Sequence, residues 1–297
     1  MREIAQTEID HWHQHGYVIA REFMTPEEVA AARENLACYM PTWEEFTARG
    51  PMFADLHGTS TRSTPGWVRY EFPYVGEALN HVAVHPFLVA FAERLVGHGN
   101  IALSHGAVVG KYAGRADYDQ ELHPDYSNNT LAFPRDGVQM IDIPMIVFHT
   151  DVTIDLGPTY VVSQELTRQL VTDGRRFHPR AEFPELYAAE RPATMPAGSA
   201  LIYNMRTFHR GSAMLASEGL RYSQFAAFHT AGPAWLGSTS FQSAGGRPEM
   251  DHFLTNATPR ERQLVGFPAP GDPYWDDETR AGVAARYPAM DMTPYGG

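Results

Sequence analysis

The sequence is short of cysteine, of positive charge and of long hydrophobic runs. Cys38 is the one cysteine among 297 residues, so no internal disulfide can form, and its place in an apolar helical pattern predicts a small buried side chain. The 23 lysines and arginines face 35 aspartates and glutamates, and the net charge of −12 disfavours nucleic acids and anionic membranes as partners. No apolar run approaches the roughly 18 residues of a membrane span, and the polar start is unlike a signal peptide. We expect a cytoplasmic protein with a small-molecule partner.

The first hundred residues carry helical signals. Apolar spacing predicts helices over 3–15, where Gly16 ends the helix, and over 86–96. Between them, Thr25-Pro26-Glu27-Glu28 is a capping box that starts a further helix. A short apolar strand is expected at 17–20.

Short β-rich segments separated by glycine and proline follow. They are predicted at 107–112, 141–148, 159–163, 199–203 and 222–228, with a hairpin turn over 134–137. This spacing predicts a mainly β fold with helical additions, an antiparallel jelly roll. We expect one domain over 1–297, in which a helical part (1–100) precedes the core (about 101–232) and a packed C-terminal cover segment (233–297) follows it.

Two histidines and an aspartate have the spacing of a metal site. His123-Pro124-Asp125 is followed 86 residues later by His209, and each lies beside the end of an expected strand. Two imidazoles and one carboxylate on one face of a metal form the facial triad of non-heme iron(II) oxygenases, which leaves positions open for a co-substrate and dioxygen. His123, Asp125 and His209 are therefore the candidate metal ligands and catalytic centre.

A cation for a dicarboxylate co-substrate follows the triad. Arg221 lies 12 residues after His209, at the start of an expected neighbouring strand. A guanidinium can hold a carboxylate bidentately, as a co-substrate with a distal carboxylate requires. The hydroxyl of Ser212 can add a hydrogen-bond donor.

Several separated motifs resemble the phytanoyl-CoA dioxygenase-like family of iron(II)/2-oxoglutarate oxygenases. The resemblance covers roughly residues 17–228 and implies a double-stranded β-helix with a cupin-like core. It implies that His123, Asp125 and His209 bind Fe(II), that Arg221 and Ser212 hold the 5-carboxylate of 2-oxoglutarate, and that O2 is the oxidant. Thr130 is a further candidate co-substrate contact. The motifs are Gly16-Tyr17-Val18-Ile19, Thr25–Glu28, His123-Pro124-Asp125, Thr150-Asp151-Val152-Thr153 with Gly157-Pro158, Ala197-Gly198-Ser199-Ala200-Leu201, His209-Arg210-Gly211-Ser212 and Arg221.

The sequence departs from this family in two places. Arg210-Gly211 stands where many members have glycine alone, so the loop before Ser212 is one residue longer. Gln164-Glu165 stands where a histidine is usual, at a position not expected to bind metal.

A second histidine–aspartate pair competes with the first. His149-Thr150-Asp151 has the same pattern, but it closes an apolar run and leads into a glycine–proline turn, so we favour His123. His11 and His15 share one helix face without an acidic partner and are expected to be exposed.

The resemblance implies hydroxylation of an unactivated C–H bond, because an aspartate in the triad leaves no position for halide; desaturation or cyclisation would use the same centre. Candidate substrate-lining residues are Trp67, Arg69, Tyr126 and Asn128. Two alternatives remain open on the residues alone: a zinc hydrolase that uses the same ligands, or a non-catalytic jelly-roll binding protein.

Overall fold

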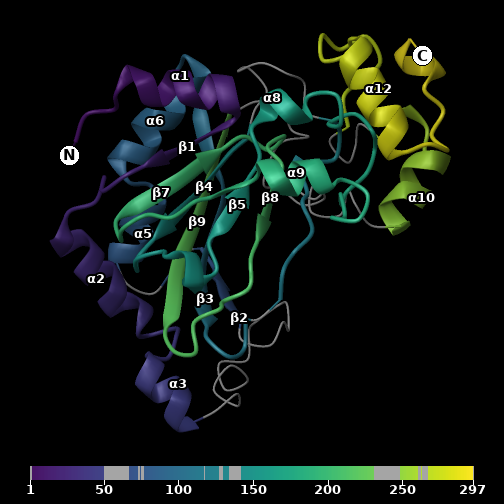
Figure 1. The fold of residues 1–297 in the computed structure, drawn as a ribbon. Coiled ribbons are helices and arrows are strands. Elements are labelled where there is room, and N and C mark those ends of the chain that lie inside the picture. Colours follow the sequence, from purple (N-terminus) through teal and green to yellow (C-terminus); the bar gives the residue numbers. More distant parts are fainter. Residues whose placement is uncertain are drawn as a thin grey trace.

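The computed structural model describes residues 2–49, 67–72, 74, 77–116, 118–126, 130–133, 142–230, 248–259, 262 and 267–296. Two antiparallel sheets form its centre (Figure 1), one with the strand order β1-β7-β4-β9-β3-β2 and one with the order β6-β5-β8. The strands are β1 (Tyr17–Ala20), β2 (Trp67–Glu71), β3 (Ile101–Tyr112), β4 (Asp142–Phe148), β5 (Thr159–Val161), β6 (Arg191–Pro192), β7 (Ser199–Tyr203), β8 (His209–Gly211) and β9 (Leu220–Thr230). The expected mainly β fold with helical additions is confirmed, and its sheets are consistent with a jelly roll.

Helices lie around the larger sheet and at one end of the molecule (Figure 1). The longer ones are α1 (Gln6–His15), α2 (Pro26–Leu36), α3 (Trp43–Arg49), α5 (Glu77–Ala83), α6 (Pro86–Val96), α10 (Pro248–Asn256) and α12 (Asp277–Arg286). Shorter segments are α8 (Gln164–Thr167), α9 (Pro184–Ala189), and the 3-10 turns Ile154–Leu156 and Thr293–Tyr295. Among the described helices, none combines the length and the apolar content that crossing a lipid bilayer requires.

Local sequence signals explain the N-terminal helices. Gly16 ends α1 in the left-handed conformation at φ 81°, which glycine adopts without a side-chain clash. Thr25 caps α2, because its hydroxyl accepts the amide hydrogen of Glu28 while the Glu28 carboxylate accepts that of Thr25. Both features agree with the sequence expectation.

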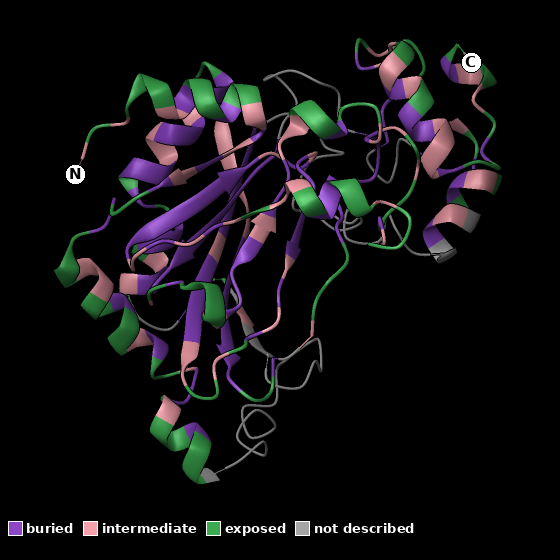
Figure 2. Cartoon of the chain, viewed as in Figure 1, coloured by how far each residue is buried: buried purple, intermediate pink, exposed green. Residues whose placement is uncertain are grey.

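The larger sheet is covered on both faces, and every residue of β4 is buried (Figure 2). Because side chains alternate along a strand, Ile143, Met145 and Val147 point to the outer face and join the core under the N-terminal helices. Ile146 and Phe148 point to the inner face, where they pack with residues of the smaller sheet. The inner face is therefore the space between the two sheets.

The C-terminal segment packs on the chain that follows β3. Val283 and Tyr287 of α12 share a core with Leu122 and Phe133. A Cβ at Gly282 would overlap the Phe133 ring, so only glycine fits where α12 crosses this segment. The residues from 267 to 296 thus form a packed cover beside the segment that contains His123 and Asp125.

Some expectations differ from the structure. Cys38 is exposed, because α2 ends at Leu36 and the following turn points Cys38 outward, so the prediction of a buried side chain was wrong. The strand expected at 107–112 begins at Ile101, and β2, α3 and α5 were not foreseen. The hairpin turn expected at 134–137 lies outside the described residues.

Candidate metal and co-substrate site

His123 and His209 are direct backbone partners. They form an isolated antiparallel bridge in which each amide nitrogen donates to the other residue's carbonyl oxygen at 3.0 Å. Opposed residues in an antiparallel pair point their side chains to the same side, and the two imidazole centroids lie 4.7 Å apart. Two histidines separated widely in sequence are thus held side by side by main-chain hydrogen bonds.

Asp125 completes the group. Its Oδ1 lies 3.5 Å from Nε2 of His209, and its Oδ2 accepts a hydrogen bond from the Tyr203 hydroxyl at 2.8 Å. One ligand atom from each of His123, Asp125 and His209 lies within 4.8 Å of the others, so one ion can touch all three. The structure therefore brings together the three residues that the sequence nominated.

Each imidazole is oriented by a carbonyl oxygen. Nδ1 of His123 lies 2.7 Å from the Glu121 carbonyl, and Nδ1 of His209 lies 3.0 Å from that of Thr207. A carbonyl oxygen can only accept, so Nδ1 carries the proton in both rings and Nε2 presents its lone pair to the site. This is the tautomer that a histidine metal ligand needs.

The ionisation of His123 and Asp125 also suits a cation. Burial and the neighbouring His209 lower the pKa of His123 to about 4, so the ring is neutral at pH 7. Burial alone would raise the pKa of Asp125, but the two imidazoles and the Tyr203 hydroxyl outweigh it and lower that pKa. Two imidazoles and one carboxylate are the donor set preferred by non-heme iron(II).

A second group of ligand types lies on the helical side. Glu28, His81 and His85 also bring ligand atoms within 4.8 Å of one another. However, Nδ1 of His85 accepts the amide hydrogen of Phe87 at 3.1 Å, so Nε2 carries the proton and donates toward Glu28 at 3.3 Å. His85 therefore caps α6 and has no lone pair left for a metal.

Two buried cations lie side by side on the strands that lead away from the triad. Lys111 of β3 and Arg221 of β9 are cross-strand partners, with exposed fractions of 4% and 5%. Lys111 Nζ donates to the Ser212 carbonyl at 3.3 Å, and Arg221 donates to the Gly157 carbonyl. Among the described residues, neither cation has a carboxylate in salt-bridge range, and Nε of Arg221 is buried without a hydrogen-bond partner. Two such buried cations can receive an anionic group such as a carboxylate.

The pKa values of both cations lie below their ordinary values. Burial and the nearby Arg221 lower the pKa of Lys111 to about 7. Burial likewise lowers the pKa of Arg221 to about 10. Two cations that are both desolvated repel each other, and a bound carboxylate would relieve this repulsion.

The cation pair belongs to the same inner face as the triad. The Arg221 guanidinium lies 5.4 Å from the Phe148 ring centroid, and Phe148 shares its core with Tyr203. Tyr203 in turn contacts Asp125 through its hydroxyl and lies 4.7 Å from the His209 ring. A ligand anchored at Arg221 can therefore extend along the inner face toward the triad.

Lys111 and Tyr203 were missed by the sequence reasoning. Lys111 is the only lysine in the chain and lies inside an apolar strand. This unusual position could have identified it from the sequence. Tyr203 closes the apolar run of β7 and carries no comparable signal, because its role depends on the position of Asp125.

Ser212 and Thr130 have other partners in this structure. The Ser212 hydroxyl donates to the Pro158 carbonyl at 2.7 Å, so its backbone rather than its side chain meets Lys111. The Thr130 hydroxyl donates to the Tyr126 carbonyl at 3.0 Å and accepts from Arg286 at 3.2 Å, beneath the C-terminal segment. Both remain predictions as co-substrate contacts.

The candidate lining residues are placed unevenly. Trp67 and Arg69 of β2 pair through their backbones with Lys111 and Val109. Tyr126 is buried, and its hydroxyl donates to the Val171 carbonyl at 2.7 Å. Asn128 lies outside the described residues.

The competing pair at 149–151 does not reach this site. His149 follows the outward-pointing residues of β4, and its Nε2 lies 3.1 Å from the Gln224 side chain, which donates to the Leu79 carbonyl of α5. Asp151 is exposed and accepts the amide hydrogen of Ala197 at 2.8 Å. No potential metal group among the described residues includes His149.

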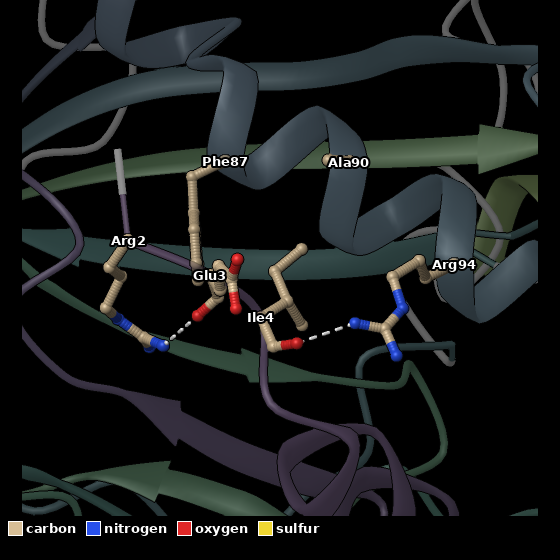
Figure 3. A pocket seen from close by; sticks show the side chains of 6 residues that line it. All are labelled: Arg2, Glu3, Ile4, Phe87, Ala90 and Arg94. Atoms are coloured by element: carbon tan, nitrogen blue, oxygen red, sulfur yellow. Dashed lines mark hydrogen bonds between the residues drawn. The ribbon is translucent and has the colours of Figure 1, made fainter.

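A cavity of about 350 Å³ lies between the N-terminal arm and α6 (Figure 3). Its walls include Arg2 and Arg94, whose guanidinium groups donate to the carbonyls of Glu3 and Ile4 at 2.9 and 2.7 Å. These cations are already paired and the cavity shares no lining residue with the triad, so it is not the reaction site.

The sequence pattern of the phytanoyl-CoA dioxygenase (PhyH) family matches residues 12–221. No curated protein sequence matches the chain.

Similar solved structures include the epimerase SnoN with Fe3+, alpha ketoglutarate and nogalamycin RO (TM-score 0.57, 19% identity, 80% of this chain and 88% of that chain). The alpha ketoglutarate dependent carbocyclase SnoK from nogalamycin biosynthesis has a TM-score of 0.56 at 15% identity, over 80% and 88% of the two chains. HygX from Streptomyces hygroscopicus, with nickel, 2-oxoglutarate and hygromycin B bound, has a TM-score of 0.56 at 15% identity, over 77% and 88%. At these identities the likeness shows a shared fold.

Proposed function

The chain belongs to the phytanoyl-CoA dioxygenase family, which makes it an iron- and 2-oxoglutarate-dependent enzyme, and we propose that it hydroxylates an unactivated C–H bond of a small molecule. The observation that carries the proposal is the pairing of the His123–Asp125–His209 group with the buried Lys111–Arg221 pair on one inner face. A metal alone would need only the first group. A dicarboxylate co-substrate needs both.

Iron bound by the triad, together with 2-oxoglutarate and O2, supplies an oxidant for C–H bonds while the co-substrate is converted to succinate and carbon dioxide. His123 and His209 would hold the ion through Nε2, because each Nδ1 is committed to a carbonyl oxygen. Asp125 would bind through Oδ1 while Tyr203 holds Oδ2. With Asp125 as the third protein ligand, the metal would have no position left for a halide, which supports oxygen transfer.

Lys111 and Arg221 would receive the distal carboxylate of 2-oxoglutarate. Both side chains are buried, and the Nε–H of Arg221 has no described partner, so the carboxylate would satisfy a donor that the fold leaves open. Ser212 and Thr130 are further candidate contacts with the co-substrate. Such fixed binding would aim the reacting end of the molecule at the metal.

The substrate is proposed to be a small molecule. This is supported by two structurally similar proteins, which bind hygromycin B and nogalamycin RO in their structures. Trp67 and Arg69 are proposed to contribute to its binding, because their backbones run beside Lys111 and Val109. Tyr126 and Asn128 are less direct candidates, since the Tyr126 hydroxyl is bonded to the Val171 carbonyl.

Succinate formation without added substrate tests the proposal. Protein, iron(II), ascorbate and 2-oxoglutarate are mixed in air, and succinate is measured against an anaerobic control. We expect succinate only with iron and O2, and none from Asp125→Ala. Asp151→Ala is the matched control, because Asp151 is an exposed aspartate of the competing motif, and it should retain iron and turnover.

Three outcomes would contradict the proposal. Hydrolytic activity with zinc under nitrogen, independent of 2-oxoglutarate, would favour the zinc hydrolase. Absence of both metal binding and succinate would favour a binding protein. Loss of iron from the Asp151 variant but not from the Asp125 variant would move the metal site to the competing motif.

A further inference from the structure

Arg210 stands between the metal ligand His209 and the loop that reaches Lys111. Its side chain is 5% exposed and is fully engaged by two carboxylates. Nε and Nη2 donate to the two oxygens of Glu190 at 2.7 and 2.8 Å, and Nη1 donates to Oδ1 of Asp119 at 2.8 Å. A bidentate arginine–carboxylate pair with a second carboxylate beyond it fixes the guanidinium in position and orientation.

Two aromatic rings add to this anchor. The Arg210 guanidinium lies 4.6 Å from the Tyr160 ring centroid and 5.6 Å from that of Tyr187. The Tyr187 hydroxyl accepts the amide hydrogen of Leu122 at 3.0 Å and donates to the His178 carbonyl at 2.9 Å. The ring against Arg210 is thus itself bonded to the residue before His123.

Asp119 and Gln120, next to this cluster, join the two segments that hold the candidate metal ligands. Oδ1 of Asp119 accepts the amide hydrogen of Ala213 at 3.0 Å as well as Nη1 of Arg210. Gln120 bonds Gly211 twice, through its amide to the Gly211 carbonyl and through Oε1 to the Gly211 amide, both at 2.9 Å. Residues 119–123 and 209–213 are therefore joined along their length, with Arg210 on the side away from the metal.

We propose that Arg210 is the positioning residue of this site, holding the segment with His123 and Asp125 against the segment with His209 and Ser212. The inference rests on the proposed function and concerns the residue that the longer loop introduces. The Ser212 carbonyl accepts a hydrogen bond from Lys111. Arg210 would therefore position the metal ligands and also Lys111, one of the two cations proposed to bind the co-substrate. A variant at Arg210 should thus weaken iron and 2-oxoglutarate binding together.

The test measures binding rather than turnover. Dissociation constants for iron(II) and for 2-oxoglutarate are measured under nitrogen, the second from the visible charge-transfer absorption of the iron complex. Arg210→Gln should weaken iron binding roughly 10- to 100-fold, the usual cost of losing a group that orients metal ligands, and should also weaken 2-oxoglutarate binding. Arg210→Lys should recover part of both, since an ammonium can pair with Glu190 but cannot bridge to Asp119 in the same fork geometry.

Arg180→Gln is the matched control. Arg180 lies 3.7 Å from the same Glu190 and 4.3 Å from the same Tyr187 ring, but its side chain is 61% exposed and lies outside β8. Its replacement should leave both dissociation constants within about twofold. Asp119→Ala is the second test, because a 58% exposed side chain can be removed with little risk to folding, and it cuts the ties to Arg210 and Ala213.

Hydrogen exchange of the metal-free protein supplies a readout apart from the loaded enzyme. In the Arg210→Gln and Asp119→Ala variants, the amides of Gln120, His123 and His209 should exchange faster, while those of α6 keep their wild-type rates. Wild-type binding of both ligands by the two variants would overturn the inference, even if their Tm values fall. If the wild-type protein itself binds neither ligand, the proposed function fails instead.

Discussion

Tyr203 donates its hydroxyl hydrogen to Oδ2 of Asp125 at 2.8 Å, which leaves Oδ1 as the oxygen nearest to His209. Burial and the Asp125 charge raise the pKa of Tyr203 well above its ordinary value, so the hydroxyl remains a donor. Oδ2 of the carboxylate is thereby bonded to the protein, and Oδ1 is the oxygen that could bind a metal.

Tyr203→Phe should weaken iron(II) binding by about tenfold, because Asp125 loses the bond that orients it. Equilibrium binding under nitrogen measures this. Tyr222→Phe is the control: its hydroxyl donates to the Pro41 carbonyl at 2.6 Å on the outer face, so the variant should lose about 1 kcal/mol of stability and keep its iron affinity. Equal iron affinity in the wild-type and Tyr203→Phe proteins would contradict the role of Tyr203.

The KM for 2-oxoglutarate should rise with pH above about 7. Burial and the nearby Arg221 lower the pKa of Lys111 to about 7, so the free protein loses this positive charge as the pH increases. A bound dicarboxylate favours the charged form, and binding then takes up a proton, which raises KM by up to about tenfold per pH unit. In Lys111→Met, KM should be higher and independent of pH in this range; a profile that parallels the wild type would assign the titration to another group.

Asp142 should make the protein less stable as the pH rises. Burial raises the pKa of Asp142 to about 7, although the Ser104 hydroxyl donates to it at 2.7 Å. The folded state therefore favours the protonated form, so the contribution to stability is present below about pH 4 and is lost as the pH rises through about 7. Asp142→Asn should be more stable than wild type at pH 8, by up to roughly 4 kcal/mol, with the difference vanishing near pH 4. Urea unfolding at both values measures it, and a difference that does not change with pH would rule out the protonated form.

Gly282→Ala should destabilise the protein, although alanine is more favourable than glycine in a helix interior by about 1 kcal/mol. The added Cβ would overlap the buried Phe133 ring, which packs on the segment after Asp125. We expect a lower Tm and faster hydrogen exchange over residues 267–296. Gly99→Ala meets only the end of the flexible Glu93 side chain at 3.3 Å and should leave Tm nearly unchanged. A rise in Tm for Gly282→Ala would show that the helix preference outweighs the contact.

The sequence alone determined the features that depend on neighbouring residues or on a recurrent order of motifs. The capping box at Thr25–Glu28 and the apolar face of α6 follow from helical spacing, and the order of His123, Asp125, His209 and Arg221 indicated the chemistry. Cys38 shows the limit of such patterns, because its exposure depends on where α2 ends.

Only the tertiary structure decided which side chains share a face and which lie across from one another. His149 and His123 each begin a histidine–x–aspartate motif. Strand alternation nevertheless turns His149 toward the helices, while backbone pairing with His209 turns His123 inward. Lys111 meets Arg221 through the register of β3 and β9, and Arg210 meets Asp119 across about ninety residues of chain. Register and facing arise from contacts between distant strands, so composition and local spacing do not contain them.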